Sequence, residues 1–385
     1  MNITAKILRT GGVLAAIMLF PAVSMLQAAE VSIAQVNRTL GMPVFAQKNS
    51  WDLRAFHQRT KLPLTGNAGR YSARGMGRKT AGCPIVEVVV NANDRGRIAA
   101  ITFVFANKGD TAGKHEAKIR ETGKNIKKAL TSLLGPASKE RPRPGYERSE
   151  VWNFARAKIA LEIQKGEFAM LHILPPAAAG NSSGTTNYSK NVKRSDFGDV
   201  WIENIPMVDQ GPKGYCVPAT MERVLRYFGQ NIDQHHLADI GGTNKGGGTR
   251  LDEMLRDIGS IRRKSKLKQN RFSAVSTKNV ASFIDQGYPV MWAMFSTEEL
   301  MEVYAFSIQN RPRAASQSAW IRTIKKLSVP RKEDGAHICL IIGYNRETDE
   351  IGVSNSWGAG HIKPIWIPVK VANRISQKEL LVFHP

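Results

Sequence analysis

Apolar residues recur at helical spacing after residue 216 and predict a short helix there. Pro218 falls in the first turn, where its missing N–H costs no hydrogen bond, and Gly229 would end the helix. The apolar positions share one face of the helix: Val217, Met221, Val224, Leu225 and Phe228. Cys216 is therefore expected at the helix N-terminus, where unpaired N–H groups and the helix dipole favour a thiolate over a thiol. The alternative is a small buried structural thiol.

Two apolar runs flank a polar turn at residues 345–350, which is typical of a β-hairpin. His337 and Asn355 are placed symmetrically about residue 346, inside that turn. Antiparallel pairing would set the two nearly opposite each other, with side chains about 5 Å apart. An asparagine oxygen at that place can fix the imidazole tautomer, which leaves the other ring nitrogen free to take a proton from Cys216.

Residues 29–175 predict a separate α+β domain. A helix with one apolar face is expected over residues 114–134, ended by Gly135 and Pro136. β-branched and apolar runs predict strands at 85–90, 99–106, 151–154, 159–164 and 168–173. No catalytic spacing occurs in this part, so its isolated histidines are expected to be structural: His57, His115 and His172.

Residues 176–195 are small, polar and without periodicity, which predicts a linker to a second domain over residues 196–385. The chain carries 55 basic and 32 acidic residues, a net charge of +23. Residues 29–195 hold 28 of the basic and 12 of the acidic residues, so the basicity belongs mainly to the N-terminal part. This charge predicts either attraction to an anionic envelope surface or simply a solvated exterior. Nucleic acid is not expected as a partner, because no recognition motif is present.

An export signal is predicted at residues 1–28. Lys6 and Arg9 precede an apolar stretch that contains Pro21, and Ala28–Ala29 offer a cleavage site. The stretch is shorter than the ~20 residues of a membrane-spanning helix. We therefore expect a cleaved signal peptide and a soluble periplasmic or secreted protein; an uncleaved anchor is the alternative.

No cofactor or metal is expected from this sequence. Its three cysteines are too few for a disulfide-stapled domain and contain no CxxC spacing: Cys83, Cys216 and Cys339. Adjacent His235 and His236 would point apart on a helix, and residues 246–248 lack the Lys-Ser/Thr of a phosphate loop. Whether Cys83 and Cys339 pair in an oxidising compartment stays open.

Taken together, these segments resemble the papain-like cysteine peptidases. Gln210 lies six positions before Cys216, His337 opens a strand, and an Asn-Ser-Trp-Gly box begins at Asn355. The Cys-x-Pro-Ala start, the Leu-Arg-Tyr-Phe-Gly run and a later Gly-Gly-Thr further resemble the double-glycine-leader (bacteriocin-processing) peptidases. The resemblance is limited to residues 200–385. It implies an α+β fold with a helical half and an antiparallel sheet half, preceded here by the smaller α+β domain.

The resemblance also implies a role for each motif residue. Cys216 would be the nucleophile, His337 the base and Asn355 the residue that orients the imidazole. Gln210 would donate its side-chain amide to the oxyanion hole, beside the backbone N–H of Cys216. Trp357 would pack over the His–Asn pair.

Two features depart from the leader-peptidase pattern. Val217 stands where those relatives usually have glycine, and Asn355 stands where they usually have aspartate. No transporter is attached, so export of leader peptides is not implied.

The expected function is therefore that of an exported cysteine peptidase, which hydrolyses peptide bonds through a thioester. One alternative is an amidase or transacylase that uses the same triad on cell-wall peptides. The other is an inactive peptidase-like module that binds anionic envelope polymers. The N-terminal domain is expected to tether the enzyme to an anionic surface or, alternatively, to cover the cleft as an inhibitory pro-region.

Overall fold

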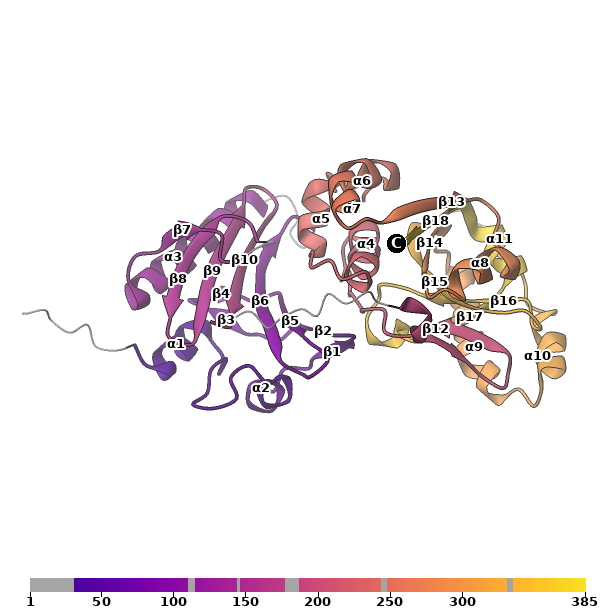
Figure 1. Cartoon of the computed structure of the whole chain (residues 1–385), viewed down its shortest axis with the longest axis horizontal. Coiled ribbons are helices and arrows are strands. Elements are labelled where there is room, and N and C mark those ends of the chain that lie inside the picture. Colours follow the sequence, from indigo (N-terminus) through magenta and orange to yellow (C-terminus); the bar gives the residue numbers. More distant parts are fainter. Residues whose placement is uncertain (1–30, 110–114, 144–145, 177–186, 244–247, 331–334) are drawn as a thin grey trace, which may run out of the picture.

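The computed structural model describes residues 31–109, 115–143, 146–176, 187–243, 248–330 and 335–385. These residues form two α+β domains, each built on its own antiparallel sheet (Figure 1). The signal peptide predicted at residues 1–28 lies outside the described residues. Among the helices of the described ranges, none is long and apolar enough to cross a membrane.

The N-terminal domain has an eight-stranded antiparallel sheet. In spatial order its strands are β1 (Thr65–Asn67), β2 (Arg70–Arg74), β5 (Glu87–Ala92), β6 (Ile98–Asn107), β10 (Phe168–Leu174), β9 (Ala157–Gln164), β8 (Ser149–Phe154) and β7 (Ser138–Glu140). Helix α3 (His115–Leu134) crosses one face of this sheet and contacts β6, β8, β9 and β10. Its buried side includes Ile119, Ile126 and Leu130, as the helical spacing predicts.

The longer elements of this domain lie close to their predicted positions, whereas the short ones were not predicted. Two short helices precede the sheet, α1 (Ile33–Leu40) and α2 (Leu53–Thr60). A two-stranded ribbon of β3 (Lys79–Thr80) and β4 (Cys83–Pro84) stands beside the sheet. Both helices carry N-cap signals that the sequence displays, a capping box of Ser32 with Gln35 and a cap by Asp52.

The C-terminal domain contains a second eight-stranded sheet. Its main path runs β11 (Val192–Arg194), β12 (Asp199–Ile202), β15 (Ala336–Asn345), β14 (Val290–Phe295), β18 (Ser376–His384) and β13 (Lys268–Phe272), while β16 (Glu350–Ser354) joins β15 to β17 (Ile365–Pro368). Strands β15 and β16 are the predicted hairpin. Short 3₁₀ turns occur at η1 (Tyr188–Asn191), η2 (Arg311–Arg313) and η3 (Ala359–His361).

Four helices of this domain stand between the two sheets in Figure 1: α4 (Cys216–Tyr227), α5 (Gln234–Ile240), α6 (Leu251–Asp257) and α7 (Gly259–Lys264). The remaining helices are α8 (Thr277–Ile284), α9 (Glu298–Asn310), α10 (Gln317–Ile324) and α11 (Val369–Ile375). The apolar face of α4 joins the core, with Val217, Met221, Val224 and Leu225 buried. The α+β fold, with a helical half beside an antiparallel sheet half, is the fold class that the sequence predicts.

The linker predicted over residues 176–195 is wrong at its C-terminal end. Residues 177–186 lie outside the described ranges, but Val192–Arg194 form strand β11 and pair with β12. The ring of Tyr188 packs against the rings of Tyr227, at the end of α4, and Phe228, which follows it. The polar composition of this segment hid a short edge strand, because an edge strand needs few apolar residues.

The three cysteines are free thiols. Cys83 is buried in the core of the N-terminal domain and Cys339 in the core of the C-terminal domain. The two therefore do not pair in this structure. His235 and His236 do not converge on one site either, because each faces a different N-terminal carboxylate, Glu87 at 3.8 Å and Glu162 at 2.8 Å.

Candidate active site

Helix α4 begins at Cys216, as the sequence predicts. Tyr215 precedes it, and the Tyr215 side chain caps none of the N–H groups of the helix. The thiol accepts hydrogen bonds from the backbone N–H groups of Ile338, Val217 and Cys216 itself. Since Ile338 follows His337 on β15, the thiol lies where α4 meets the strand that carries the histidine.

The ionisation of Cys216 differs from the sequence prediction. Burial raises the pKa of the Cys216 thiol above its usual value, and the surrounding N–H groups offset this only in part. The predicted preference for a thiolate is therefore wrong for the resting protein. Desolvation at the junction of helix and sheet outweighs the helix terminus, and the sequence shows only the second of these effects.

His337 and Asn355 form the predicted pair. The Nε2 atom of His337 lies 3.0 Å from Oδ1 of Asn355, and both side chains are buried. The predicted register is wrong by two residues: symmetry about residue 346 would pair Leu340 with Gly352, whereas Leu340 pairs with Ser354. A bulge lies between Ile341 and Gly343. The contact survives because Asn355 lies just past the end of β16 and reaches the histidine diagonally.

Two aromatic side chains hold this pair in place. The Asn355 amide nitrogen donates to the hydroxyl of Tyr304 on α9, at 3.3 Å. The ring of Trp357 lies 4.8 Å from the ring of His337 at an interplanar angle of 32°, which is the packing that the sequence predicts. Tyr304 was not predicted, since nothing in its local sequence distinguishes it from a core tyrosine.

The imidazole rests in its neutral form. Burial lowers the pKa of His337 to about 4, although the bond to Asn355 opposes this shift. Because Asn355 Oδ1 can only accept, the proton of the neutral ring lies on Nε2. Nδ1 is then the atom that can accept a proton. In the described part of the chain, the bonding partners of the Cys216 thiol are backbone N–H groups and not this nitrogen.

Gln210 lies on the loop that leads into α4. Its side-chain oxygen accepts from the hydroxyl of Ser356 at 2.7 Å, and its Nε2 donates to the carbonyl of Lys213 at 3.2 Å. Its backbone N–H donates to the Ser356 carbonyl at 2.9 Å. An amide nitrogen carries two hydrogens, so Nε2 keeps one for an oxyanion. The loop and the Asn-Ser-Trp-Gly box are thus joined at Gln210.

A polar stripe on α4 was missed by sequence reasoning. The Thr220 hydroxyl donates to the Ile338 carbonyl at 3.2 Å, which ties the helix to β15 beside His337. The Arg223 guanidinium is buried and donates to Pro206 and Ser354. The signal was present, because Cys216, Thr220 and Arg223 fall on one helix face at i, i+4 and i+7.

A cavity of about 280 Å³ lies beside residues 212–215, which directly precede Cys216 in the chain. It is lined by residues of both domains: Lys108 and Gly109 from the N-terminal domain, with Pro212, Lys213, Gly214, Tyr215 and Thr243 from the C-terminal domain. The N-terminal domain therefore reaches the loop that leads to Cys216.

The fold and this constellation define a domain of papain-like cysteine peptidase fold. Residues 202–373 match the family described as Peptidase_C39 like, and this match supports a papain-like cysteine peptidase. The N-terminal domain lies outside the matched residues. No curated protein matches the chain significantly.

Two solved structures are similar to this chain. The peptidase domain of Streptococcus ComA, a bifunctional ABC transporter involved in a quorum-sensing pathway, is 12% identical with a TM-score of 0.30; the match covers 46% of this chain and 97% of that one. Xylellain, a cysteine protease from Xylella fastidiosa, is 13% identical with a TM-score of 0.31, and the match covers 54% of this chain and 93% of that one.

Proposed function

We propose that this protein is a cysteine peptidase that hydrolyses peptide bonds through a thioester on Cys216. The observation that carries the proposal is the buried His337–Asn355 bond of 3.0 Å beside the N-terminus of the helix that starts at Cys216. A structural thiol would require neither an oriented imidazole nor the amide of Gln210 on the adjoining loop.

Acylation begins with a proton transfer from Sγ of Cys216 to Nδ1 of His337 as the sulfur attacks the peptide carbonyl. The C–S bond forms and the carbonyl oxygen becomes an oxyanion, to which Nε2 of Gln210 and the backbone N–H of Cys216 donate. The C–N bond then breaks, and His337 gives its proton to the departing amine. Burial raises the pKa of the Cys216 thiol and lowers that of His337, which favours the neutral pair before substrate binds.

Deacylation uses the same groups in reverse. Water attacks the thioester while His337 takes one of its protons, and the C–S bond breaks as that proton returns to the sulfur. Asn355 keeps Nε2 protonated throughout, so Nδ1 stays directed at the reaction.

Export is part of this proposal and is supported by the charge and apolar pattern of residues 1–28. Attraction to an anionic envelope surface is supported by the basicity of residues 29–195. A peptide or protein substrate follows from the peptidase family that residues 202–373 match.

The test is to incubate the purified protein with a defined peptide mixture and identify new termini by mass spectrometry, alongside labelling with an epoxysuccinyl thiol inhibitor. We expect peptide cleavage and a single adduct on Cys216, both abolished in Cys216→Ala. Cys83→Ala is the matched control, because Cys83 is a buried free thiol of the other domain. Cleavage by Cys216→Ala would overturn the proposal. Transfer of the acyl group to an added amine in place of water would identify a transacylase with the same thioester.

A further inference from the structure

The loop from residue 203 to residue 215 joins β12 to the nucleophile helix and carries Gln210. We call it the nucleophile loop. Alternate residues of this loop, from Ile205 to Tyr215, are contacted by the N-terminal domain, whereas Gln210 faces the Asn-Ser-Trp-Gly box. The loop is therefore held between the two domains.

Asn67, at the end of β1, holds the start of the nucleophile loop through both the nitrogen and the oxygen of its side-chain amide. Its Nδ2 donates to the Ile205 carbonyl at 3.0 Å, and its Oδ1 accepts from the Met207 N–H at 2.8 Å. A side-chain amide used in this way replaces the hydrogen bonds that a neighbouring strand would provide. The backbone of residues 205–207 is thus fixed by a residue of the other domain.

Two arginines of β2 hold the middle of the loop. Arg70 donates to the Met207 carbonyl and Arg74 to the Asp209 carbonyl, each at 3.4 Å. Gly211 has a φ of +66°, and a Cβ added there would lie 2.5 Å from Nη1 of Arg74. The guanidinium of Arg74 therefore lies against Asp209 and Gly211, the two chain neighbours of Gln210.

Gly109, just beyond β6, lies against the end of the loop. A Cβ added at Gly109 would lie 2.7 Å from Cδ of Lys213 and 2.8 Å from Cε1 of Tyr215. Tyr215 is the residue before Cys216. Contact with the N-terminal domain therefore continues to the start of the nucleophile helix.

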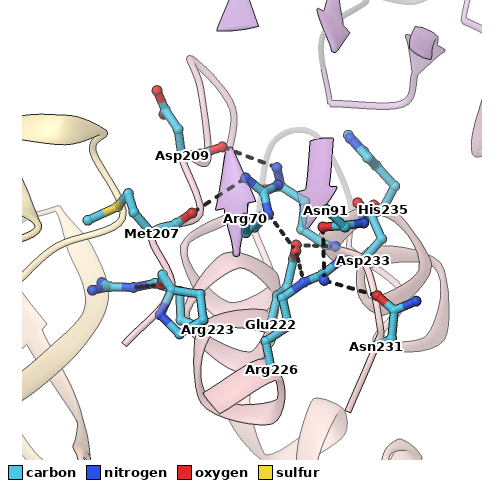
Figure 2. Close-up of polar contacts among 12 residues, drawn as sticks. Arg70, Asn91, Met207, Asp209, Glu222, Arg223, Arg226, Asn231, Asp233 and His235 are labelled. Atoms are coloured by element: carbon cyan, nitrogen blue, oxygen red, sulfur yellow. Dashed lines mark hydrogen bonds and ion pairs between the residues drawn. The ribbon is translucent and has the colours of Figure 1, made fainter. Parts of the chain in front are cut away.

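The arginines themselves are fixed by buried carboxylates of both domains. Figure 2 shows Arg70 directed at Glu222 on α4, with Nε 2.8 Å from the carboxylate, and Arg226 on the same oxygen at 2.6 Å. Glu87 on β5 contacts Arg74 and lies 3.8 Å from Arg70. Arg70, Glu87 and Glu222 are each at most 1% exposed, so water cannot replace these partners.

We propose that the N-terminal domain is a permanent part of the active site, in which Asn67 and Arg74 are positioning residues that hold the nucleophile loop so that the amide of Gln210 meets the oxyanion. This inference rests on the proposed peptidase function. It assigns the domain a role other than a tether or a removable pro-region. Covalent chemistry stays with Cys216 and His337, and the two positioning residues act through Gln210.

The test uses the full chain and compares Asn67→Ala and Arg74→Ala with Arg59→Ala. Arg59 is a matched control because it also donates to several backbone carbonyls, those of Pro43, Val44, Asn49 and Ser50, all within its own domain. Amide hydrogen exchange of the peptide spanning residues 203–215 reports the order of the loop without any need for activity. We expect faster exchange in the two loop variants and unchanged exchange in Arg59→Ala.

Kinetics then separate positioning from general weakening. Asn67→Ala and Arg74→Ala should each lower kcat at least tenfold with little change in KM, while the rate of Cys216 alkylation by iodoacetamide, which needs no oxyanion hole, stays within about twofold. In a Gln210→Ala background the same substitutions should cost less than about threefold, because they act through the amide already removed.

Each outcome bears on a separate claim. Unchanged loop exchange in both variants would overturn the positioning role whatever the activity. If exchange is faster but each substitution lowers kcat as much in the Gln210→Ala background as in the wild-type protein, the two residues do not act through Gln210. A wild-type protein that cleaves no peptide would overturn the proposed function, while the exchange measurement still decides whether the N-terminal domain orders the loop.

Discussion

Arg223 donates through Nη1 and Nη2 to the carbonyl and hydroxyl oxygens of Ser354, at 2.9 and 2.6 Å. Its Nε also donates to the Pro206 carbonyl at 3.1 Å. Arg223 lies two turns after Cys216, and Ser354 immediately precedes Asn355. One buried guanidinium thus joins α4, the loop of residues 203–215 and the end of β16 that precedes Asn355.

Replacing Arg223 should damage stability and activity together. Arg223→Ala removes the three hydrogen bonds that the guanidinium donates to Ser354 and Pro206, at roughly 1–3 kcal/mol for each buried oxygen left unsatisfied. We expect the urea midpoint to fall by an amount equivalent to at least ~3 kcal/mol at constant m-value, measured by tryptophan fluorescence. Lys326→Ala, on the surface after α10, is the control. An unchanged midpoint for Arg223→Ala would show that these bonds contribute nothing net.

The thiol of Cys216 should titrate above the ordinary range. Burial raises its pKa, so iodoacetamide alkylation should be slow near neutral pH and reach its midpoint above the ~8.5 of a free thiol. Burial also raises the pKa values of Cys83 and Cys339, and both are less exposed. Cys216 should therefore be labelled first, as peptide mapping would show. A midpoint well under 8 would restore the thiolate that the helix terminus predicts.

The acid limb of peptide hydrolysis should lie near pH 4. His337 must be unprotonated to accept the thiol proton, and burial lowers its pKa to about 4. kcat/KM should therefore stay flat from about pH 5.5 through neutrality and fall tenfold per pH unit well below pH 4. Trp357→Leu changes the packing over the imidazole and should shift this limb. A limb near pH 6.5 would mean that His337 is solvated during turnover.

The triad residues should differ in their effect on turnover. His337→Ala removes the proton acceptor, while Asn355→Ala only frees the ring, so the first should lose more activity. Gln210→Ala removes one oxyanion donor and should cost about 10²–10³ in kcat. Steady-state kinetics on a cleaved peptide, with folding checked by circular dichroism, measures all three. Equal losses for Asn355→Ala and His337→Ala in folded proteins would contradict the assigned roles.

The domain interface should weaken in acid. Burial would raise the pKa values of Glu87 and Glu162, but the partners Arg74, His235 and Arg70 around Glu87, and His172 and His236 around Glu162, lower both to about 2. A carboxyl with a lowered folded-state pKa stabilises the fold above its unfolded pKa, and this stability is lost as pH falls through the folded value.

The unfolding free energy should therefore decline between about pH 4.5 and pH 2, by roughly 3 kcal/mol for each of the two carboxyls. Urea unfolding at a series of pH values measures the decline. Glu162→Gln should flatten the slope, whereas Glu150→Gln should not, since Glu150 pairs with a half-exposed Lys127 on the surface. Equal slopes for all three proteins would remove Glu162 from the acid response.

The sequence by itself determined the local features of this protein. Helical spacing after residue 216 placed Cys216 at the start of α4, and the two apolar runs around residues 345–350 predicted the hairpin of β15 and β16. Spacing of this kind is local, because the period of side-chain burial follows from the backbone geometry of each element. The same reasoning gave the helix of residues 115–134 nearly to its ends.

Only the tertiary structure decided the strand register, the ionisation of buried groups and the long-range ion pairs. Each of these depends on which groups are removed from water and which distant segments meet. Leu340 pairs with Ser354, two residues away from the predicted register, and burial at the junction of α4 and β15 raises the pKa of the Cys216 thiol, which the helix terminus alone would lower. The pairing of Arg70 with Glu222 joins residues 152 positions apart in the chain. Desolvation and long-range ion pairs depend on the assembled surroundings of a residue, and no local pattern carries that information.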